Sequence, residues 1–360
     1  MIRSAFPFGR LLAVLAAFAL VAAGCGGADD TVGTQADSET PRLASATLNA
    51  SGATFPMAFY EEVIASFKEA QPSVTVNYAG GGSGKGRQEL QDGLVDFAGS
   101  DGLVKAEDVP KYKNGEFLYV PTVTAPITVS YNLPDVKDMK LDADTVAKIF
   151  QRQITTWDDA AIKALNPDAR LPSTPITVAR RSDGSGTTEN FTKYLVSAAP
   201  STWTLKSGST VEWPADTQAG NGNNGVAGIV KGTVGAVGYV DLSDAKASSL
   251  QFATLKNAAG KFVAPTLDGT SAALEGATVN ADLSYDPLNA KGEKAYPIAA
   301  PTWILVYKNQ TDKAKAEALK GFLTYLLNDG QDLAEDADYA PLPKSLKDKA
   351  LAQLNSIVIP

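Results

Sequence analysis

Residues 178–191 have the sequence VARRSDGSGTTENF, in which an apolar strand pattern gives way to a polar loop and then to a helix. The loop begins at Arg181, and a Ser or Thr within it can cap the following helix, which we expect over Thr187–Ser197. Arginine offers a planar fork of donors, and a helix start offers free amides and a favourable dipole. The stretch therefore predicts a strand–turn–helix unit that can hold a tetrahedral anion. The simpler alternative is a capped surface helix beside an Arg181–Asp183 ion pair.

Short strands alternate with amphipathic helices on both sides of this stretch. Apolar residues at helical spacing predict helices at Met57–Ala70 and Ala314–Leu327, and period-two alternation predicts a strand at Val74–Tyr78. The same patterns predict four further elements, which are helices at Lys85–Asp92 and Val226–Val230 and strands at Val95–Ala98 and Gly235–Val240. Alternation of strand and helix favours an α/β fold.

Two extended segments, Tyr119–Tyr131 and Tyr296–Tyr307, each contain prolines that oppose helix formation. We expect them to divide the folded part of the chain into one lobe of residues 47–122 plus 300–360 and a second lobe of residues 123–299. A chain that passes twice between two α/β lobes is expected to form a hinged clamp with a ligand cleft.

The first residues predict export from the cytoplasm. Arg3 and Arg10 flank the apolar run Leu11–Ala23, which is shorter than the ~20 residues of a membrane-spanning helix. We therefore expect residues 1–24 to be a signal peptide. The roughly 315 residues beyond the first 45 are enough for two domains.

Cys25 follows the small residues Ala-Ala-Gly, in the pattern of a bacterial lipoprotein processing site. One departure is Ala22, which stands where an aliphatic residue such as leucine is usual. We expect Cys25 to carry a lipid and residues 25–46 to be a flexible tether, because they are polar and lack a hydrophobic period. The alternative is an ordinary signal peptide with an incidental cysteine.

The composition limits the function. The chain has 32 basic and 40 acidic residues, and loss of residues 1–24 removes Arg3 and Arg10, which leaves 30 basic residues and a net charge of −10. An acidic chain argues against nucleic acid as a partner. The chain has no histidine and no cysteine besides Cys25, so the commonest general base, zinc ligand and thiol nucleophile are absent. We expect a binding protein rather than an enzyme, without catalytic residues, metal or cofactor.

Two further loops carry single polar residues. Thr54 lies just before the first expected helix, where it either caps that helix or points at a ligand together with the amide of Phe55. Asp101 follows a buried strand, where a turn or cap residue is the commoner interpretation. Each loop alone is weak support for a binding site.

A glycine-rich loop spans residues 77–86 with the sequence NYAGGGSGKG. Its glycines allow backbone amides to approach an anion, and Ser83 adds a hydroxyl beside a helix start. The loop is not a P-loop, because Ala79 and Gly86 stand where a glycine and a Ser or Thr belong. A flexible turn would have the same composition.

Together, these loops resemble the periplasmic phosphate-binding protein of the phosphate-specific ABC importer, a substrate-binding lipoprotein. The matching segments are SGATFP (51–56), VDFAGSD (95–101), TTWDDAAIKALNP (155–167), ARRSDGSGTTENF (179–191) and GNNGVAGIVKGTVGAVGYV (222–240). The resemblance covers nearly all of residues 47–350, in the family's order. It implies a two-lobe type II periplasmic-binding fold with phosphate buried in the cleft.

The resemblance also assigns residues and partners. It implies phosphate contacts from Thr54, Phe55, Ser83, Asp101, Arg181, Ser185, Gly186 and Thr187, with Asp183 orienting Arg181 from behind. The family often has two consecutive serines where this chain has Ser83 followed by Gly84, and Lys85 adds a charge that faces either the cleft or solvent. The implied partners are phosphate, the membrane permease subunits of an ABC importer and its cytoplasmic ATPase, with the protein a monomer anchored to the cell membrane by lipid.

Asp101 separates phosphate from other oxyanions. An ionised carboxylate repels a fully deprotonated anion but pairs with one that keeps a proton, as phosphate does at neutral pH and sulfate does not. A binder of sulfate, molybdate or an organic solute is therefore a weaker alternative. A phosphate-ester hydrolase is weaker still, because no histidine can activate Ser185.

Overall fold

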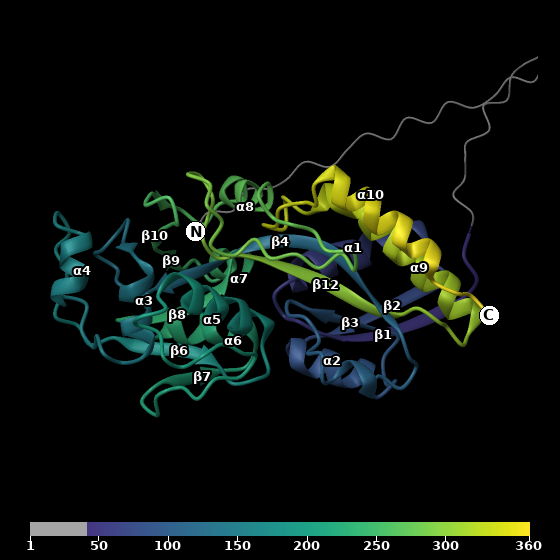
Figure 1. Cartoon of the computed structure of the whole chain (residues 1–360), viewed down its shortest axis with the longest axis horizontal. Helices are drawn as coiled ribbons and strands as arrows, with labels where there is room; N and C mark the ends of the chain where they lie inside the picture. The colour runs from purple at the N-terminus through teal and green to yellow at the C-terminus, as the bar shows by residue number, and fades with distance from the viewer. Residues whose placement is uncertain (1–41) are drawn as a thin grey trace, which may run out of the picture. The chain divides into compact units, whose positions relative to one another are not determined.

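Two long strands cross the middle of the protein and pair with each other (Figure 1). β4 (Phe117–Tyr131) and β12 (Ala299–Tyr307) run antiparallel and are almost wholly buried, as expected for continuous apolar runs. The computed structural model describes residues 42–360. The expected signal peptide, Cys25 and most of the expected tether lie outside the described residues.

One sheet runs through both strands, and its strands fall into two groups. The first strand group lies along residues 117–126 of β4 and contains β2 (Val74–Ala79), β1 (Ala46–Gly52), β3 (Phe97–Ser100) and β12. The second strand group lies along residues 127–131 of β4 and contains β8 (Ala236–Asp241), β6 (Thr177–Arg181), β7 (Gln218–Gly220) and the short β9 (Gln251–Phe252). β1 and β3 are parallel, as are β6, β7 and β8. In each group, therefore, the carboxyl ends of parallel strands share one edge, where α/β proteins place their ligands.

Helices cover both groups (Figure 1). On the first strand group, α1 (Met57–Ala70) and α9 (Lys313–Leu327) lie on one face and α2 (Ser83–Gln91) on the other, with α10 (Lys344–Gln353) beside α9. The second strand group carries α5 (Gly186–Ala198), α6 (Gly222–Gly232) and α7 (Leu242–Ala247).

Smaller elements complete the fold. They are α3 (Ala143–Phe150), α4 (Ala160–Leu165), α8 (Leu267–Leu274), a three-stranded sheet of β11 (Phe262–Val263), β10 (Thr254–Lys256) and β5 (Lys140–Leu141), and 3-10 turns at Val109–Lys111, Asp329–Leu333 and Leu354–Ser356. Within residues 42–360, no helix has the length and apolar character needed to cross a bilayer.

Aromatic side chains join the layers. Phe322 of α9 lies 5.3 Å from Phe67 of α1 and 5.7 Å from Phe97 of β3, measured between ring centroids. In the second strand group, Phe191 of α5 stacks on Tyr239 of β8 at 4.5 Å. Such pairs contribute about 0.5–1.5 kcal/mol beyond the burial of their area. The second stack fixes the start of α5 against the sheet, and that start belongs to the site.

The α/β prediction is confirmed, and several boundaries are close. The expected helix Met57–Ala70 coincides with α1, the expected segment Tyr119–Tyr131 lies within β4, and the expected segment Tyr296–Tyr307 contains β12. α2 begins at Ser83 rather than Lys85, because Gly82 with φ of 90° ends the glycine loop there. The division into lobes at residues 122–123 and 299–300 stays a prediction.

Candidate functional site

Side chains from both strand groups meet where strand ends face helix starts. Asp101 follows β3, Arg181 ends β6, Ser83 begins α2 and Ser185 caps α5. Asp101 and Arg181 are only 2% and 3% exposed, and Ser83 and Ser185 are fully buried. The fold thus brings together residues from loops that lie far apart in the sequence.

The Asp101 carboxylate accepts hydrogen bonds from two hydroxyl groups. Thr302 Oγ1 donates to Oδ1 at 2.7 Å, and Ser83 Oγ donates to Oδ2 at 3.2 Å. The backbone of Asp101 is also held, because its N–H donates to Ser83 Oγ at 3.1 Å and its carbonyl accepts from Asn190 Nδ2 at 2.6 Å. Since Asn190 belongs to α5, this last bond joins the two strand groups.

Burial raises the pKa of Asp101 to about 7. The hydrogen bond from Thr302, the charge of Arg181 and the hydrogen bond from Ser83 act in the opposite direction but do not cancel the effect of burial. This carboxyl group therefore changes its charge near neutral pH. A buried group with such a pKa, next to a buried cation, is a candidate for ligand recognition.

The Arg181 guanidinium is held by three side chains. Nε donates to Asp183 Oδ1 at 2.8 Å and Nη2 donates to Oδ2, while Nη1 donates to Asn223 Oδ1 at 3.1 Å and Thr187 Oγ1 at 3.4 Å. Burial alone would raise the pKa of Asp183, but the hydrogen bonds and charge of Arg181 outweigh it, so the pKa is lowered. Asp183 is thus an ionised partner that fixes the orientation of the guanidinium fork.

Asn223 was not predicted as a site residue from the sequence. It lies in the first turn of α6, is fully buried, and donates from Nδ2 to Thr187 Oγ1 at 3.2 Å. Its backbone N–H donates to Thr54 Oγ1 at 3.2 Å, which links the two strand groups. The Gly-Asn-Asn run before an expected helix was the signal that could have indicated it. Thr302 and Asn190 were also missed. Asn190 lies within the stretch 178–191, but nothing in the sequence indicates that either residue contacts Asp101.

The interpretation of Thr54 as a helix cap is wrong. Pro56 occupies the N-cap position of α1, and no side chain caps that helix. Proline is favoured near a helix start, because its missing N–H costs nothing there. The hydroxyl of Thr54 instead accepts a hydrogen bond from the backbone N–H of Asn223.

Glycines allow the two strand groups to touch beside these side chains. The Gly84 N–H donates to the Gly184 carbonyl at 2.8 Å. A Cβ atom on Gly186 would lie 2.4 Å from Ser83 Oγ and 2.7 Å from Asp101 Cβ, closer than packed atoms can approach. Only a glycine therefore fits where the start of α5 meets Ser83 and Asp101.

Ser185 can both cap α5 and donate a hydrogen bond to a ligand. Its Oγ accepts from the Thr188 N–H at 3.0 Å and caps α5, which leaves its hydroxyl hydrogen free to donate elsewhere. The first amides of a helix have no acceptor within the helix, so the N–H groups of Gly186 and Thr187 are also suited to an anion.

Two predicted residues lie at the margin of the site. The carbonyl of buried Phe55 accepts from the Tyr339 hydroxyl at 2.6 Å, which fixes the backbone beside Thr54. Lys85 lies 3.5 Å from Glu89 and its side chain is 47% exposed, so it faces solvent. The extra charge of Lys85 is therefore a surface feature of α2.

The donor set suits an anion rather than a cation. Two hydroxyl groups hold the Asp101 carboxylate, and the Asp183 carboxylate is paired with the Arg181 guanidinium, so the remaining groups of the site are mainly hydroxyl, amide and guanidinium donors. In the part of the chain that the structure describes, no three His, Cys, Asp or Glu residues gather closely enough to hold a metal ion.

Comparisons with known proteins show the family of this chain. A family model of the PBP superfamily domain matches residues 35–330. The phosphate-binding protein PstS of Methanocaldococcus jannaschii is 35% identical over 378 residues, which span 97% of this chain and 96% of that protein.

Solved structures show the same fold. A high-affinity periplasmic phosphate-binding protein, solved with phosphate at pH 8.5, has a TM-score of 0.71 at 23% identity and covers 85% of this chain and 93% of its own. A Clostridium perfringens protein with bound phosphate, assigned as a phosphate ABC transporter substrate-binding protein, has a TM-score of 0.63 at 19% identity and covers 83% and 100%. These structures support the type II periplasmic-binding fold.

The raised pKa of Asp101 predicts how stability depends on pH. Between pH ~4 and pH ~7 the unfolded carboxyl is ionised while the folded one keeps its proton, so the folded state loses stability as pH rises. We expect the unfolding free energy of the wild type, measured by urea denaturation in anion-free chloride buffers, to fall by up to about 4 kcal/mol relative to Asp101→Asn across this window. A difference between the two proteins that does not change with pH would contradict the account.

Proposed function

The chain belongs to the PBP superfamily and, within it, to the phosphate-binding proteins named PstS, and from this premise we propose that it binds inorganic phosphate and delivers it to an ABC importer. The observation that carries the proposal is the presence of one buried acceptor, Asp101, and one buried charged donor, Arg181, in a single closed site. When Asp101 is ionised, a ligand that fits both must be an anion that still carries a proton.

Asp101 gives the site its chemical selectivity. Phosphate keeps a proton at neutral and mildly alkaline pH, and sulfate keeps none. Above pH ~7 the ionised Asp101 accepts the phosphate proton and repels sulfate. Below that pH the carboxyl group carries its own proton and can donate it to either anion. Discrimination against sulfate therefore increases as pH rises through about 7.

The other predicted residues supply donors to the remaining oxygens. In this proposal Arg181 is the charged donor, Asp183 and Asn223 orient it, and the uncharged donors are the hydroxyls of Thr54, Ser185 and Thr187 and the amides of Phe55 and Gly186. Ser83 joins these donors when its hydroxyl hydrogen turns from Asp101 to the ligand. Neutral donors at helix starts bind an oxyanion without a large positive charge, which is consistent with the acidic chain.

We propose that the two strand groups act as lobes 47–122 plus 300–360 and 123–299, which close around phosphate. Three hydrogen bonds cross between them beside the site: Gly84 to Gly184, Asn190 to Asp101, and Asn223 to Thr54. They form only when the helix starts of both groups face the same small volume. Opening would break them and admit solvent and ligand.

The same chemistry favours binding without catalysis. Ser185 Oγ is engaged by the amide of Thr188, and the chain has no histidine to take its proton. A hydrolase would need such a base or a metal ion. We therefore propose that the protein is not an enzyme.

Neighbouring arginines offer a matched test of the binding site. Arg181 lies in the site, whereas Arg180 donates from Nε to Thr217 Oγ1 at 3.3 Å and from Nη1 to the Arg181 carbonyl at 3.1 Å. In calorimetric titrations with phosphate, we expect Arg181→Gln to weaken binding by about 100-fold or more, because charged hydrogen bonds are lost, and Arg180→Gln to change it by less than about threefold. Circular dichroism checks that both variants are folded. Equal affinities for the two variants would place phosphate elsewhere.

We further propose that the protein is a monomer held at the outer side of the cytoplasmic membrane by a lipid on Cys25. The support is the sequence Ala-Ala-Gly-Cys after an apolar run, followed by a polar segment that links it to residues 42–360. Such a tether keeps the binding protein close to the permease subunits while leaving it free to open and close.

Metabolic labelling with a fatty-acid analogue tests the anchor. The full chain should take up the label and Cys25→Ser should not, because only the cysteine thiol can be lipidated. Both proteins should bind phosphate equally, since Cys25 lies outside the part of the chain that forms the site. Absence of label in the wild type would refute the anchor and leave the binding site unaffected.

A further inference from the structure

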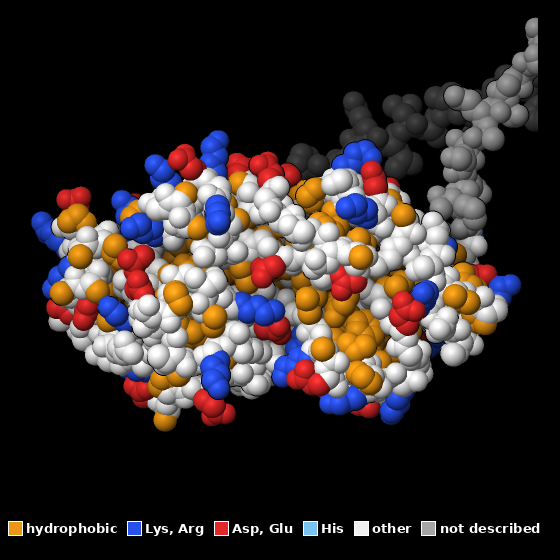
Figure 2. Space-filling model, viewed as in Figure 1, with side chains coloured by type: hydrophobic (Ala, Val, Ile, Leu, Met, Phe, Trp, Pro, Cys, Tyr) orange, Lys and Arg blue, Asp and Glu red, His pale blue; other side chains and the backbone are white. Residues whose placement is uncertain are grey.

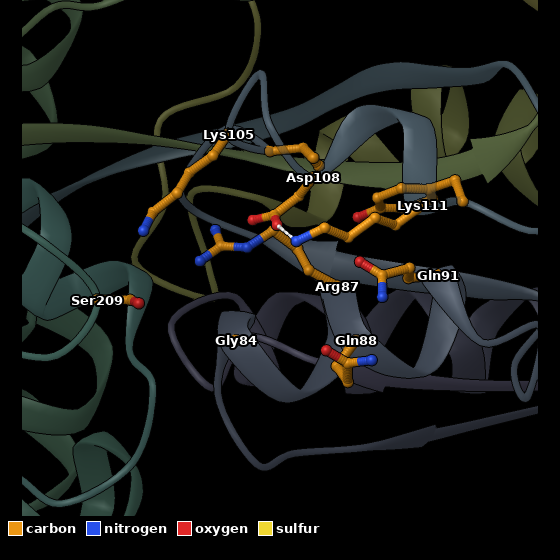
Figure 3. A pocket seen from close by; sticks show the side chains of 10 residues that line it. Gly84, Arg87, Gln88, Gln91, Lys105, Asp108, Lys111 and Ser209 are labelled. Carbon is orange, nitrogen blue, oxygen red and sulfur yellow. Dashed lines mark hydrogen bonds and ion pairs between the residues drawn. The ribbon is translucent and has the colours of Figure 1, made fainter.

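A hollow lies between α2 and the segment that follows Asp101 (Figure 3). Its volume is about 220 Å³, enough for an ion the size of phosphate. One wall is α2, with Gly84 and Arg87, and another is the segment that follows Asp101, with Lys105 and Lys111. Ser209 closes it from the second strand group, so both strand groups contribute to this outer hollow.

The outer hollow is positively charged although the protein is acidic. Three cations line it, Arg87, Lys105 and Lys111, against one carboxylate, Asp108. Lys111 is paired with Asp108 at 2.6 Å, and Arg87 lies 3.6 Å from Glu189. On the face seen in Figure 2, acidic and basic side chains are interspersed, so the net negative charge forms no single acidic block there.

Lys105 is the least compensated of these charges, because it acts on Asp108 only at a distance, whereas Lys111 is paired with that carboxylate. Within residues 42–360 its ammonium group makes no hydrogen bond and no ion pair, and its side chain is exposed. In Figure 3 the Lys105 side chain and the Arg87 guanidinium both extend toward the wall that carries Ser209. A cleft with one dominant sign of charge concentrates ions of the opposite sign.

Each wall of the outer hollow is joined directly to the inner site. Gly84 follows Ser83 in the chain, and the carbonyl of Ser209 accepts from the Ser185 N–H at 2.9 Å. Arg87 donates from Nη1 to Ser100 Oγ and to the Gly102 carbonyl, both at 3.0 Å.

Ser100 and Gly102 are the neighbours of Asp101, so Arg87 lies between the outer hollow and that carboxyl group. The Gly84–Gly184 hydrogen bond joins the two strand groups at the same place. An anion bound in the outer hollow would therefore lie beside the Gly84–Gly184 contact, which must open before the anion can enter the inner site.

We propose that this outer hollow is an entry site where inorganic phosphate is captured by Lys105 and Arg87 before it passes into the inner site. The inference rests on the proposed function of the inner site and adds the route by which the ligand reaches it. The outer site does not select among oxyanions, because its carboxylate, Asp108, is already occupied by Lys111. Sulfate therefore competes for entry even though the inner site rejects it.

Association kinetics test the entry site. Residues 42–360 form one compact unit without a cysteine, so a fluorophore on Val196→Cys, at an exposed position of α5, can report closure in stopped-flow experiments. We compare Lys105→Gln with Lys137→Gln, which removes the same charge from an exposed lysine that does not line the hollow. At about 10 mM ionic strength, we expect Lys105→Gln to lower the phosphate association rate constant about threefold or more, and Lys137→Gln to leave it nearly unchanged. The effect should shrink at about 0.3 M salt.

Sulfate provides the second readout. At equal ionic strength, sulfate should slow phosphate association to the wild type more than chloride does, and this excess should disappear in Lys105→Gln. Equal rate constants for the two lysine variants, or no excess effect of sulfate, would refute the entry site while phosphate binding itself persists. Failure of the wild type to bind phosphate at equilibrium would instead refute the proposed function.

Discussion

Burial of a carboxyl group close to a buried guanidinium is the constraint on which the site depends. Removing a charge from water costs several kcal/mol per ion, so each buried charge needs a partner. Arg181 receives a full partner in Asp183, with Asn223 and Thr187 completing its hydrogen bonds. Asp101 receives only hydroxyl groups, and its pKa accordingly lies at about 7. A protonated oxyanion can therefore donate a further hydrogen bond to the Asp101 carboxylate.

The fold serves this chemistry by bringing two strand groups into contact. β4 runs through both groups, and helix starts from both sides converge on one small volume. Glycines at the contact are required by space, as the position of Gly186 against Ser83 and Asp101 shows. Selectivity and closure therefore have the same physical origin, since the residues that recognise the anion also hold the groups together. The outer hollow adds positive charge on the proposed route to the site and leaves the hydrogen bonds of Asp101 and Arg181 unchanged.

Much of the fold and of the candidate site could be predicted from the sequence, because the signals that indicate them lie in short stretches of the chain. The spacing of apolar residues located α1 and α9, and the loops with Thr54, Ser83, Asp101 and Arg181 were recognisable because strand ends and helix starts have local signatures. Thr302 and Asn190 were not predictable, because they reach Asp101 only through the pairing of β12 with β3 and the docking of α5. Short elements such as α4 and β10 were missed because their stability comes from tertiary packing rather than local pattern.

The most direct test of the central claim is the ratio of phosphate to sulfate affinity at pH 6 and pH 8.5, measured by calorimetry for the wild type and for Asp101→Asn. The account predicts a wild-type preference for phosphate that widens with pH, and a preference in Asp101→Asn that is at least about tenfold smaller and nearly independent of pH. An unchanged ratio in Asp101→Asn would show that the carboxyl group does not recognise the phosphate proton, and the selectivity mechanism would have to be abandoned.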